Sequence, residues 1–155
     1  MKKALGLSYP AILVAAAAAF VVGSLWYSPL LFGGEWMRLR GLDPHATAAM
    51  PMPSGMLLAE FVREVVAAYV LARFVGLLEV ADWKAAVRLG AWAWVGFPGT
   101  LLAGSVMWEG VPWQLAAIHA GDWLVKILLM AVILGVWRWR QFDSHNGTIG
   151  TNAAG

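Results

Sequence analysis

The sequence predicts an all-α, polytopic membrane protein with four transmembrane helices in a compact bundle. Hydrophobic residues make up 61% of the 155 residues and charged residues only 13%, whereas a globular chain has roughly 25% charged residues. The apolar residues gather in four runs, each near the roughly 20 residues that cross about 30 Å of hydrocarbon. Ten tryptophans fit this class, because tryptophan concentrates at membrane interfaces. The composition excludes a soluble enzyme, a disordered chain and a nucleic-acid-binding protein.

The first predicted span covers about residues 8–26 and has no charged side chain. Its start resembles a signal peptide, with two lysines before an alanine-rich run. The apolar run continues to Trp26, however, which is long for the hydrophobic region of such a peptide, so we expect an uncleaved first helix. The other spans are predicted at about residues 56–78, 85–107 and 112–137. Pro98 should kink the third of them.

We expect one transmembrane domain over residues 1–140 and a polar, flexible cytoplasmic tail over residues 141–155. The long external connection, residues 27–55, contains several prolines and glycines that exclude a single continuous helix. Within it, residues 35–40 are expected to form one or two helical turns in the membrane interface. The two later connections are short.

The basic residues predict the orientation of the chain in the membrane. If the N-terminus is cytoplasmic, the inner side carries seven basic residues: Lys2, Lys3, Arg73, Lys84, Arg88, Arg138 and Arg140. The outer side then carries only Arg38 and Arg40. Cytoplasmic loops are enriched in lysine and arginine, so both termini should be cytoplasmic.

Small residues recur every four positions in two of the predicted spans. The residues are Ala11, Ala15, Ala19 and Gly23 in the first span, and Gly96, Thr100 and Gly104 in the third. Such stripes let helix backbones approach closely in lipid. They predict either packing within one bundle or a face that docks on another subunit, and the sequence leaves both alternatives open.

Ionisable residues inside the second and fourth spans form the most informative pattern. The second span carries Glu60, Arg63 and Glu64 on one helix face, and the fourth carries His119, Asp122 and Lys126 on one face. An unpaired charge near a helix centre costs about 2.5–3.5 kcal/mol on insertion scales, so these charges should be paired. We predict that Arg63 pairs with Asp122, and that Lys126 pairs with Glu60 or Glu64. The five charged residues sum to −1, which suggests a protonated carboxyl group or a charged His119.

This cluster has two interpretations. It is either a buried ionic lock that fixes helix pairing, or a proton or cation relay or a binding site for a polar head group.

The sequence offers little for a metal or an enzyme. The chain has no cysteine, and no other span contains a histidine that would join His119 in binding haem or zinc. A single tetrapyrrole or pigment at His119 is a weak alternative to the expectation of no cofactor. We find no nucleophile–base–acid arrangement and no phosphate-binding loop, which favours a non-enzymatic protein.

The segment after the first span has the pattern Gly-x-x-Trp-Tyr-Ser-Pro-x-x-Phe-Gly, beginning at Gly23. It resembles the hallmark of an uncharacterised family of small bacterial four-span membrane proteins, a domain of unknown function. The last span, from Ala120 to Arg138, is similar to the last helix of that family. The resemblance covers about the first 137 residues and implies the topology without implying an activity.

The hallmark also has a physical interpretation. Its anchor residues are Trp26, Tyr27, Pro29, Phe32 and Trp36. The aromatic residues are expected to lie at the membrane interface, and the proline to end the first helix. Either they form a simple aromatic belt, or they cap the ionisable cluster and act as a gate.

Together with the resemblance to a bacterial family, these features lead us to expect a non-enzymatic integral protein of the bacterial inner membrane that acts through helix association. Its partners would be the lipid bilayer and either a second copy or another membrane protein of a larger complex, to which it would be a small accessory subunit. The alternative is a small transporter or ion-conducting protein that uses the cluster on the second and fourth spans.

Overall fold

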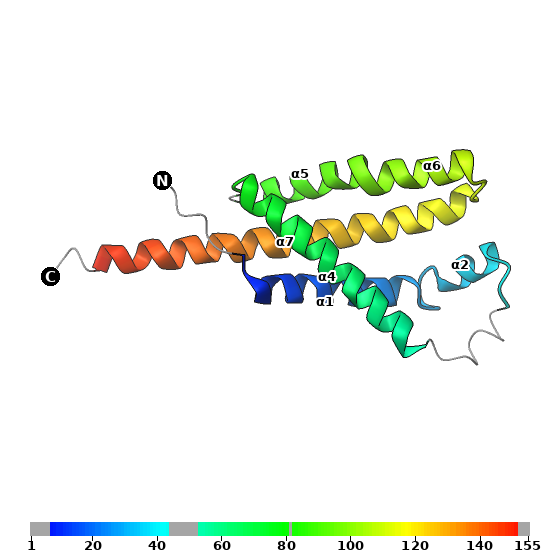
Figure 1. Cartoon of the computed structure of the whole chain (residues 1–155), viewed down its shortest axis with the longest axis horizontal. Helices are drawn as coiled ribbons and strands as arrows, with labels where there is room; N and C mark the ends of the chain where they lie inside the picture. Colours follow the sequence, from blue (N-terminus) through cyan, green and yellow to red (C-terminus); the bar gives the residue numbers. More distant parts are fainter. Residues whose placement is uncertain (1–6, 44–52, 81, 152–155) are drawn as a thin grey trace.

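The computed structural model describes residues 7–43, 53–80 and 82–151, and within them it contains helices and no strand. The elements are α1 (Tyr9–Trp26), α2 (Gly33–Leu39), α4 (Ser54–Leu77), α5 (Trp83–Trp94), the π-helical segment η1 (Val95–Gly99), α6 (Thr100–Trp108) and α7 (Trp113–Thr151). Figure 1 shows that α1, α4, α5–α6 and α7 alternate in direction along the chain. The prediction of an all-α fold is confirmed.

Helix α7 is the centre of the fold. It packs against α1 on one side and α5 on the other, while α4 crosses it obliquely (Figure 1). The helices can approach closely because many of the buried side chains are alanines: Ala11, Ala15, Ala16, Ala19, Ala68, Ala86, Ala116 and Ala131. Glycines extend this close packing to the α5–α7 contact, where a Cβ on Gly135 would lie only 2.9 Å from the Cβ of Ala86.

The π-helical segment η1 joins α5 and α6 without a break in helical backbone conformation. Pro98 lies within it. Proline has no N–H group, and its ring clashes with the carbonyl group of the residue four positions earlier, here Trp94. The wider π turn accommodates both effects. The disturbance predicted at Pro98 is therefore present as a local change of helix type.

The helix ends differ from the predicted ones at several places. Helix α4 begins two residues earlier than expected, at Ser54, and α7 continues to Thr151 instead of ending near residue 137. Residues 141–151, which the sequence assigns to the tail, therefore continue α7. No proline interrupts this stretch, and each added residue of a formed helix gains one backbone hydrogen bond. Residues 1–6, 44–52, 81 and 152–155 lie outside the described part, including parts of the predicted N-terminus, external loop and tail.

Specific contacts fix the ends of the central helices. The carboxylate of Asp82 accepts a hydrogen bond from the N–H of Ala85 at 2.8 Å and caps α5. The guanidinium of Arg138 donates to the carbonyl of Val75 at 2.7 Å, in the last turn of α4, where a positive charge is favourable. Gly110 takes the left-handed conformation, with φ of 68°, in the turn between α6 and α7.

Within the described residues, two helices are long and apolar enough to span a membrane: α1 over Tyr9–Trp26 and α7 over Trp113–Arg140. Both helices are also largely exposed. In the most apolar 18 residues of each, only 33% of α1 and 39% of α7 are buried inside the chain. Apolar side chains therefore point outward along much of both helices.

Candidate functional site: an ionic cluster between α4 and α7

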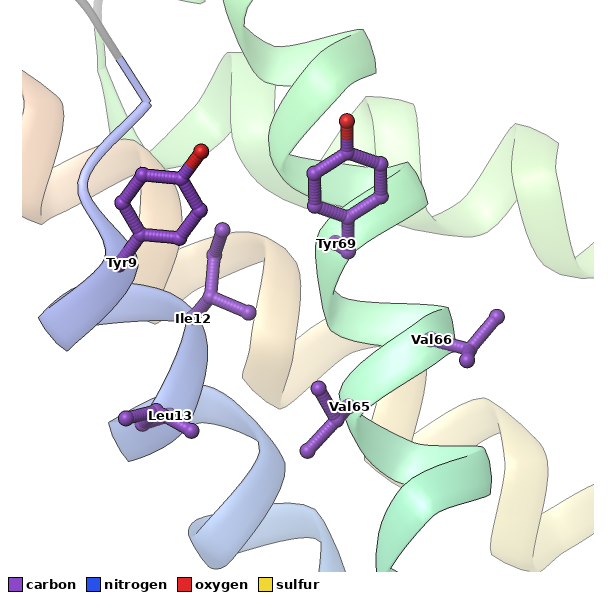
Figure 2. Close-up of a pocket in the computed structure, with 6 residues that line it drawn as sticks. All are labelled: Tyr9, Ile12, Leu13, Val65, Val66 and Tyr69. Carbon is purple, nitrogen blue, oxygen red and sulfur yellow. The ribbon is translucent and has the colours of Figure 1, made fainter.

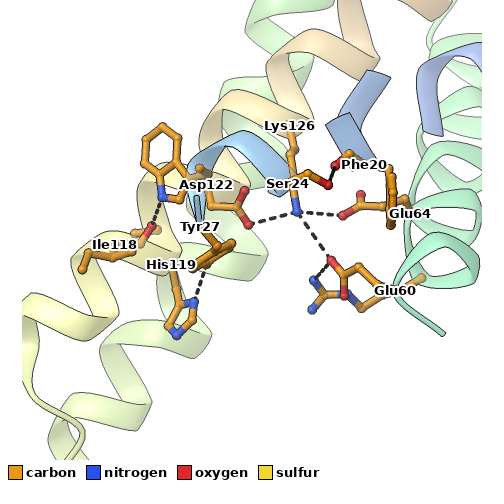
Figure 3. Close-up of polar contacts among 12 residues, drawn as sticks. Phe20, Ser24, Tyr27, Glu60, Glu64, Ile118, His119, Asp122 and Lys126 are labelled. Carbon is orange, nitrogen blue, oxygen red and sulfur yellow. Dashed lines mark hydrogen bonds and ion pairs between the residues drawn. The ribbon is translucent and has the colours of Figure 1, made fainter. Parts of the chain in front are cut away.

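The side chain of Lys126 lies at the centre of a buried ionic cluster (Figure 3). Its Nζ atom is 2.8 Å from Oε1 of Glu64, 3.0 Å from Oδ2 of Asp122 and 3.6 Å from Oε1 of Glu60. Glu64, Asp122 and Lys126 are exposed by no more than 1% of their residue surface. A charged group so deeply buried needs such partners, because desolvation of an isolated charge is very unfavourable.

The cluster follows from helix periodicity on two elements and a small residue on a third. Asp122 and Lys126 are one turn apart on α7, and Glu60 and Glu64 are one turn apart on α4. Helix α1 covers the cluster at Gly23, where a Cβ would lie 2.6 Å from Nζ and 2.8 Å from Cε of Lys126. A larger residue at this position would force the end of the Lys126 side chain to shift.

Arg63 departs from the predicted pairing. It does not take Asp122 as its ion-pair partner: its guanidinium lies 2.6 Å from Oε1 of Glu60 on its own helix. The guanidinium also stacks over the ring of Trp123, 4.9 Å from the centroid. The long, flexible Lys126 side chain reaches carboxylates on both helices, so Asp122 is already paired from its own helix. The prediction that Lys126 lies against Glu60 or Glu64 agrees with the observed distances.

His119 and Tyr27 extend the polar cluster along α7 (Figure 3). The Tyr27 hydroxyl lies 2.7 Å from Nδ1 of His119, and which of the two groups donates depends on the histidine tautomer. The same hydroxyl interacts electrostatically with the carboxylate of Asp122, but no hydrogen bond joins the two groups. A chain of polar groups runs from His119 through Tyr27 to Asp122 and Lys126. Among the described residues, no group of three or more His, Cys, Asp or Glu side chains has an arrangement that would hold a metal ion.

The cluster has unbalanced charge and unused hydrogen-bonding capacity. Its three carboxylates and two cations sum to −1 when His119 is neutral. Oε2 of Glu64 and Oδ1 of Asp122 are buried without a hydrogen-bond partner. Buried polar atoms in proteins are nearly always paired, so two unpaired carboxylate oxygens at one site call for a physical explanation.

The hallmark segment folds back over α7 beside the cluster. The Trp26 indole N–H donates to the carbonyl of Ile118 at 3.0 Å, and its ring lies 4.7 Å from the ring of Phe32. A Cβ at Gly33 would overlap the carbonyl oxygens of Tyr27 and Ser28, so the turn after Pro29 requires glycine there. The ring of Trp36, on α2, meets the Tyr27 ring edge-on at 5.8 Å. The anchor residues thus pack on one another and on α7.

Three residues contribute to the site but were not predicted from the sequence. Gly121 lets the Trp26 ring lie against α7, the Trp94 indole donates to the carbonyl of Ala120 at 2.9 Å, and Trp123 faces Arg63. The small pair Ala120–Gly121 between two polar residues is the signal that could have indicated a close approach. The identity of the incoming aromatic side chains depends on helices distant in sequence.

The two small-residue stripes have different environments. In α1, Ala11, Ala15, Ala19 and Gly23 are buried against the rest of the bundle. In η1 and α6, Gly96 and Gly104 have no neighbouring atom within 4 Å of an added Cβ, and the Thr100 hydroxyl bonds only to its own helix. Helix α5 contacts α7 through Gly90 instead, where a Cβ would lie 3.1 Å from the side chain of Leu128.

A separate apolar pocket of about 330 Å³ lies between α1 and α4 (Figure 2). Its lining consists of Tyr9, Ile12, Leu13, Val65, Val66 and Tyr69. It has no charged group in its lining and lies toward the start of α1, away from the ionic cluster near the end of that helix. Its chemistry suits an apolar chain and offers no reactive group.

Comparison with known proteins places the chain in a family. No curated protein and no solved structure matches it significantly. One family model matches residues 10–135, which include the hallmark segment, both arms of the ionic cluster and most of α7. The prediction of an uncharacterised family is therefore confirmed: the chain belongs to the family described as "Protein of unknown function (DUF1761)".

Proposed function

We propose that this chain is a non-enzymatic, multi-pass protein of the bacterial inner membrane that acts by associating with other membrane helices. Its four spans would be α1, α4, the continuous run α5–η1–α6, and α7, with both termini in the cytoplasm. The associating surface would be the outward face of η1 and α6. The partner is either a second copy of the chain or a subunit of a larger membrane complex.

Exposed apolar side chains support the membrane assignment. Residues that water would disfavour are largely exposed on α5–η1–α6, including Trp92 at 74%, Phe97 at 61% and Leu101 at 74%. Helix α4 has 24 residues, enough to cross the hydrocarbon layer, and two of its charged residues, Glu60 and Glu64, meet Lys126 of α7. A charged helix that depends on a partner helix in this way is compatible with insertion as part of a bundle.

The unused small-residue stripe is the observation that carries the proposal. Gly96 and Gly104 lie about two turns apart with open space above them, while the bundle already packs through other small residues. In lipid, hydrophobicity does not drive helices together, so close backbone contact at such stripes is a main source of association. A second helix packed here would bury a surface that this bundle leaves open.

The test replaces glycines on this face by a large residue. Gly96→Leu and Gly104→Leu fit the isolated chain without a clash, so each variant should fold. Gly76→Leu on α4 is the matched control, because its Cβ position is equally open. Fluorescence energy transfer between labelled chains in lipid vesicles measures self-association, and affinity purification from native membranes measures capture of another subunit.

We expect both Gly96→Leu and Gly104→Leu to reduce energy transfer or partner capture, and Gly76→Leu to leave both unchanged. Loss of energy transfer identifies a homo-oligomer, whereas loss of a co-purifying protein identifies an accessory subunit. If neither readout changes in the two variants, or if the control changes as much, the proposed face is wrong.

A further inference from the structure

We propose that the ionic cluster binds one exchangeable proton, held between Glu64 and Asp122 and delivered from the Tyr27 end of the bundle. The proposal concerns the interface of α1, α4 and α7 and does not depend on the associating face of α6. It assigns a ligand to a site that would otherwise be only a structural contact between helices.

The charge balance of the cluster supports a bound proton. Every ionisable group facing the cluster has to be counted: Glu60, Arg63 and Glu64 on α4, His119, Asp122 and Lys126 on α7, Tyr27 after α1, and Arg40 after α2. Arg40 is exposed, and its guanidinium stacks on Trp36, so it does not enter the cluster. With His119 and Tyr27 neutral, the remaining groups sum to −1. One bound proton brings the buried set to neutrality.

Two unpaired carboxylate oxygens also support a bound proton. Oε2 of Glu64 and Oδ1 of Asp122 both lack a partner, although their side chains are almost completely buried. A proton on either atom removes the uncompensated charge. Ca²⁺ or Mg²⁺ would need about six or more oxygen ligands, and the ammonium of Lys126 already lies between the carboxylates. A proton is therefore the ligand that fits the atoms present.

The polar chain at one end gives a route for this proton. A hydronium ion would give its proton to Nε2 of His119 and become water, and the Nδ1–H proton would pass to the oxygen of Tyr27. The hydroxyl proton of Tyr27 would move at the same time to the carboxylate of Asp122, so the tyrosine remains neutral and nothing is oxidised or reduced. The 2.7 Å contact between Tyr27 and His119 allows the first transfer, and the second requires the Tyr27 hydroxyl to close on the unpaired Oδ1 of Asp122.

The other end of the cluster adjoins an apolar core. Beyond Lys126, the buried residues between α1, α4 and α7 are apolar: Ala11, Ile12, Ala15, Ala68, Leu71, Val75, Met130, Ala131 and Leu134. These side chains provide no donor or acceptor along which a proton could continue. This conformation therefore loads a proton from one side and does not conduct it across the bundle, which distinguishes a binding site from a channel.

Infrared difference spectroscopy of the full chain in lipid nanodiscs tests the binding site. A protonated carboxyl group has a C=O stretching band that a carboxylate lacks. We expect wild-type protein to show this band at neutral pH and to lose it in alkaline buffer while the helices remain folded. Glu64→Gln or Asp122→Asn should abolish or shift the band, and Glu35→Gln, which removes an exposed carboxylate on α2, should leave it unchanged.

The wild-type spectrum decides the proposal even if a buried variant fails to fold. Absence of the band across the pH range in which the protein is folded would overturn it, as would a band that persists unchanged in both folded variants. The route has its own test, because Tyr27→Phe keeps the ring and removes only the hydroxyl. We expect exchange of the bound proton for deuterium to slow several-fold in Tyr27→Phe, and an unchanged exchange rate would refute entry through Tyr27.

Discussion

Replacing Gly121 by alanine should destabilise the bundle, because the added methyl group has no space. Its Cβ would lie 2.7 Å from Cζ2 and 3.1 Å from Cη2 of Trp26. Carbon atoms are optimally about 3.5–4.0 Å apart, so the indole would have to move by close to 1 Å. That movement is resisted by the hydrogen bond from Trp26 to Ile118 and by the neighbouring ring of Phe32.

Three contributions determine the loss of stability: two destabilise the bundle and one stabilises it. Overpacking of a well-filled site costs about 1–3 kcal/mol. Weakening the indole hydrogen bond adds about 0.5–1.5 kcal/mol. Alanine in place of glycine within a helix returns about 0.5–1 kcal/mol. The expected net loss for Gly121→Ala is therefore about 0.5–4 kcal/mol, most of it from the contact with Trp26.

Unfolding of the purified protein in mixed micelles, with increasing denaturing detergent, measures this loss through helical circular dichroism. Gly76→Ala is the control, since its methyl group meets no atom within 4 Å. This control should be neutral or stabilised by up to about 1 kcal/mol. Trp26→Phe removes the part of the ring that clashes, so Gly121→Ala should cost much less in that background. Equal losses in both backgrounds would refute the steric explanation, as would a Gly121→Ala variant as stable as the control.

Further predictions concern the cluster and the hallmark turn. Lys126→Met leaves buried carboxylates without their cation, so unfolding in mixed micelles should show a loss of about 3–5 kcal/mol; a loss below that of Gly121→Ala would argue against a paired cluster. Gly33→Ala should disrupt the turn before α2 and expose Trp36 to a water-soluble fluorescence quencher, and unchanged quenching would contradict the proposed overlap. The hydrogen bond from Arg38 lowers the pKa of Glu35, so this exposed pair should persist at neutral pH and be lost as acid titrates the carboxylate. Tryptophan fluorescence followed during acid titration should report this loss, because Trp36 is next to Glu35 in α2. Glu35→Gln should remove the acid-dependent change in fluorescence.

Much of the site could be predicted from helix periodicity. The i, i+4 spacing of Asp122 and Lys126, and of Glu60 and Glu64, places each pair on one helix face whatever the rest of the fold does. The high cost of an unpaired charge in an apolar environment then favours pairing between the two helices. The partner predicted for Arg63, Asp122, was wrong: Asp122 and Glu60 carry the same charge, and Arg63 pairs with Glu60. Side-chain length and the position of Trp123 decided between them.

The two small-residue stripes illustrate the same limit. Both have the four-residue spacing of a packing face, and nothing in their local sequences separates them. Their environments differ because α1 lies between α4 and α7, whereas α5 contacts α7 through Gly90 and leaves Gly96 and Gly104 uncovered. Which face of a helix is covered depends on how all the helices are rotated and arranged.

The sequence by itself determined that the chain is all-helical, where most helices lie and which charged residues need partners. These properties depend on local hydrophobicity and on a fixed helical period, so they are encoded in segments of a few turns. Only the tertiary structure decided that Gly23 lies against Lys126, that Tyr27 meets His119, and that the polar cluster adjoins an apolar core. Each of these depends on distances of a few ångströms between residues far apart in sequence, and packing of the whole bundle sets those distances.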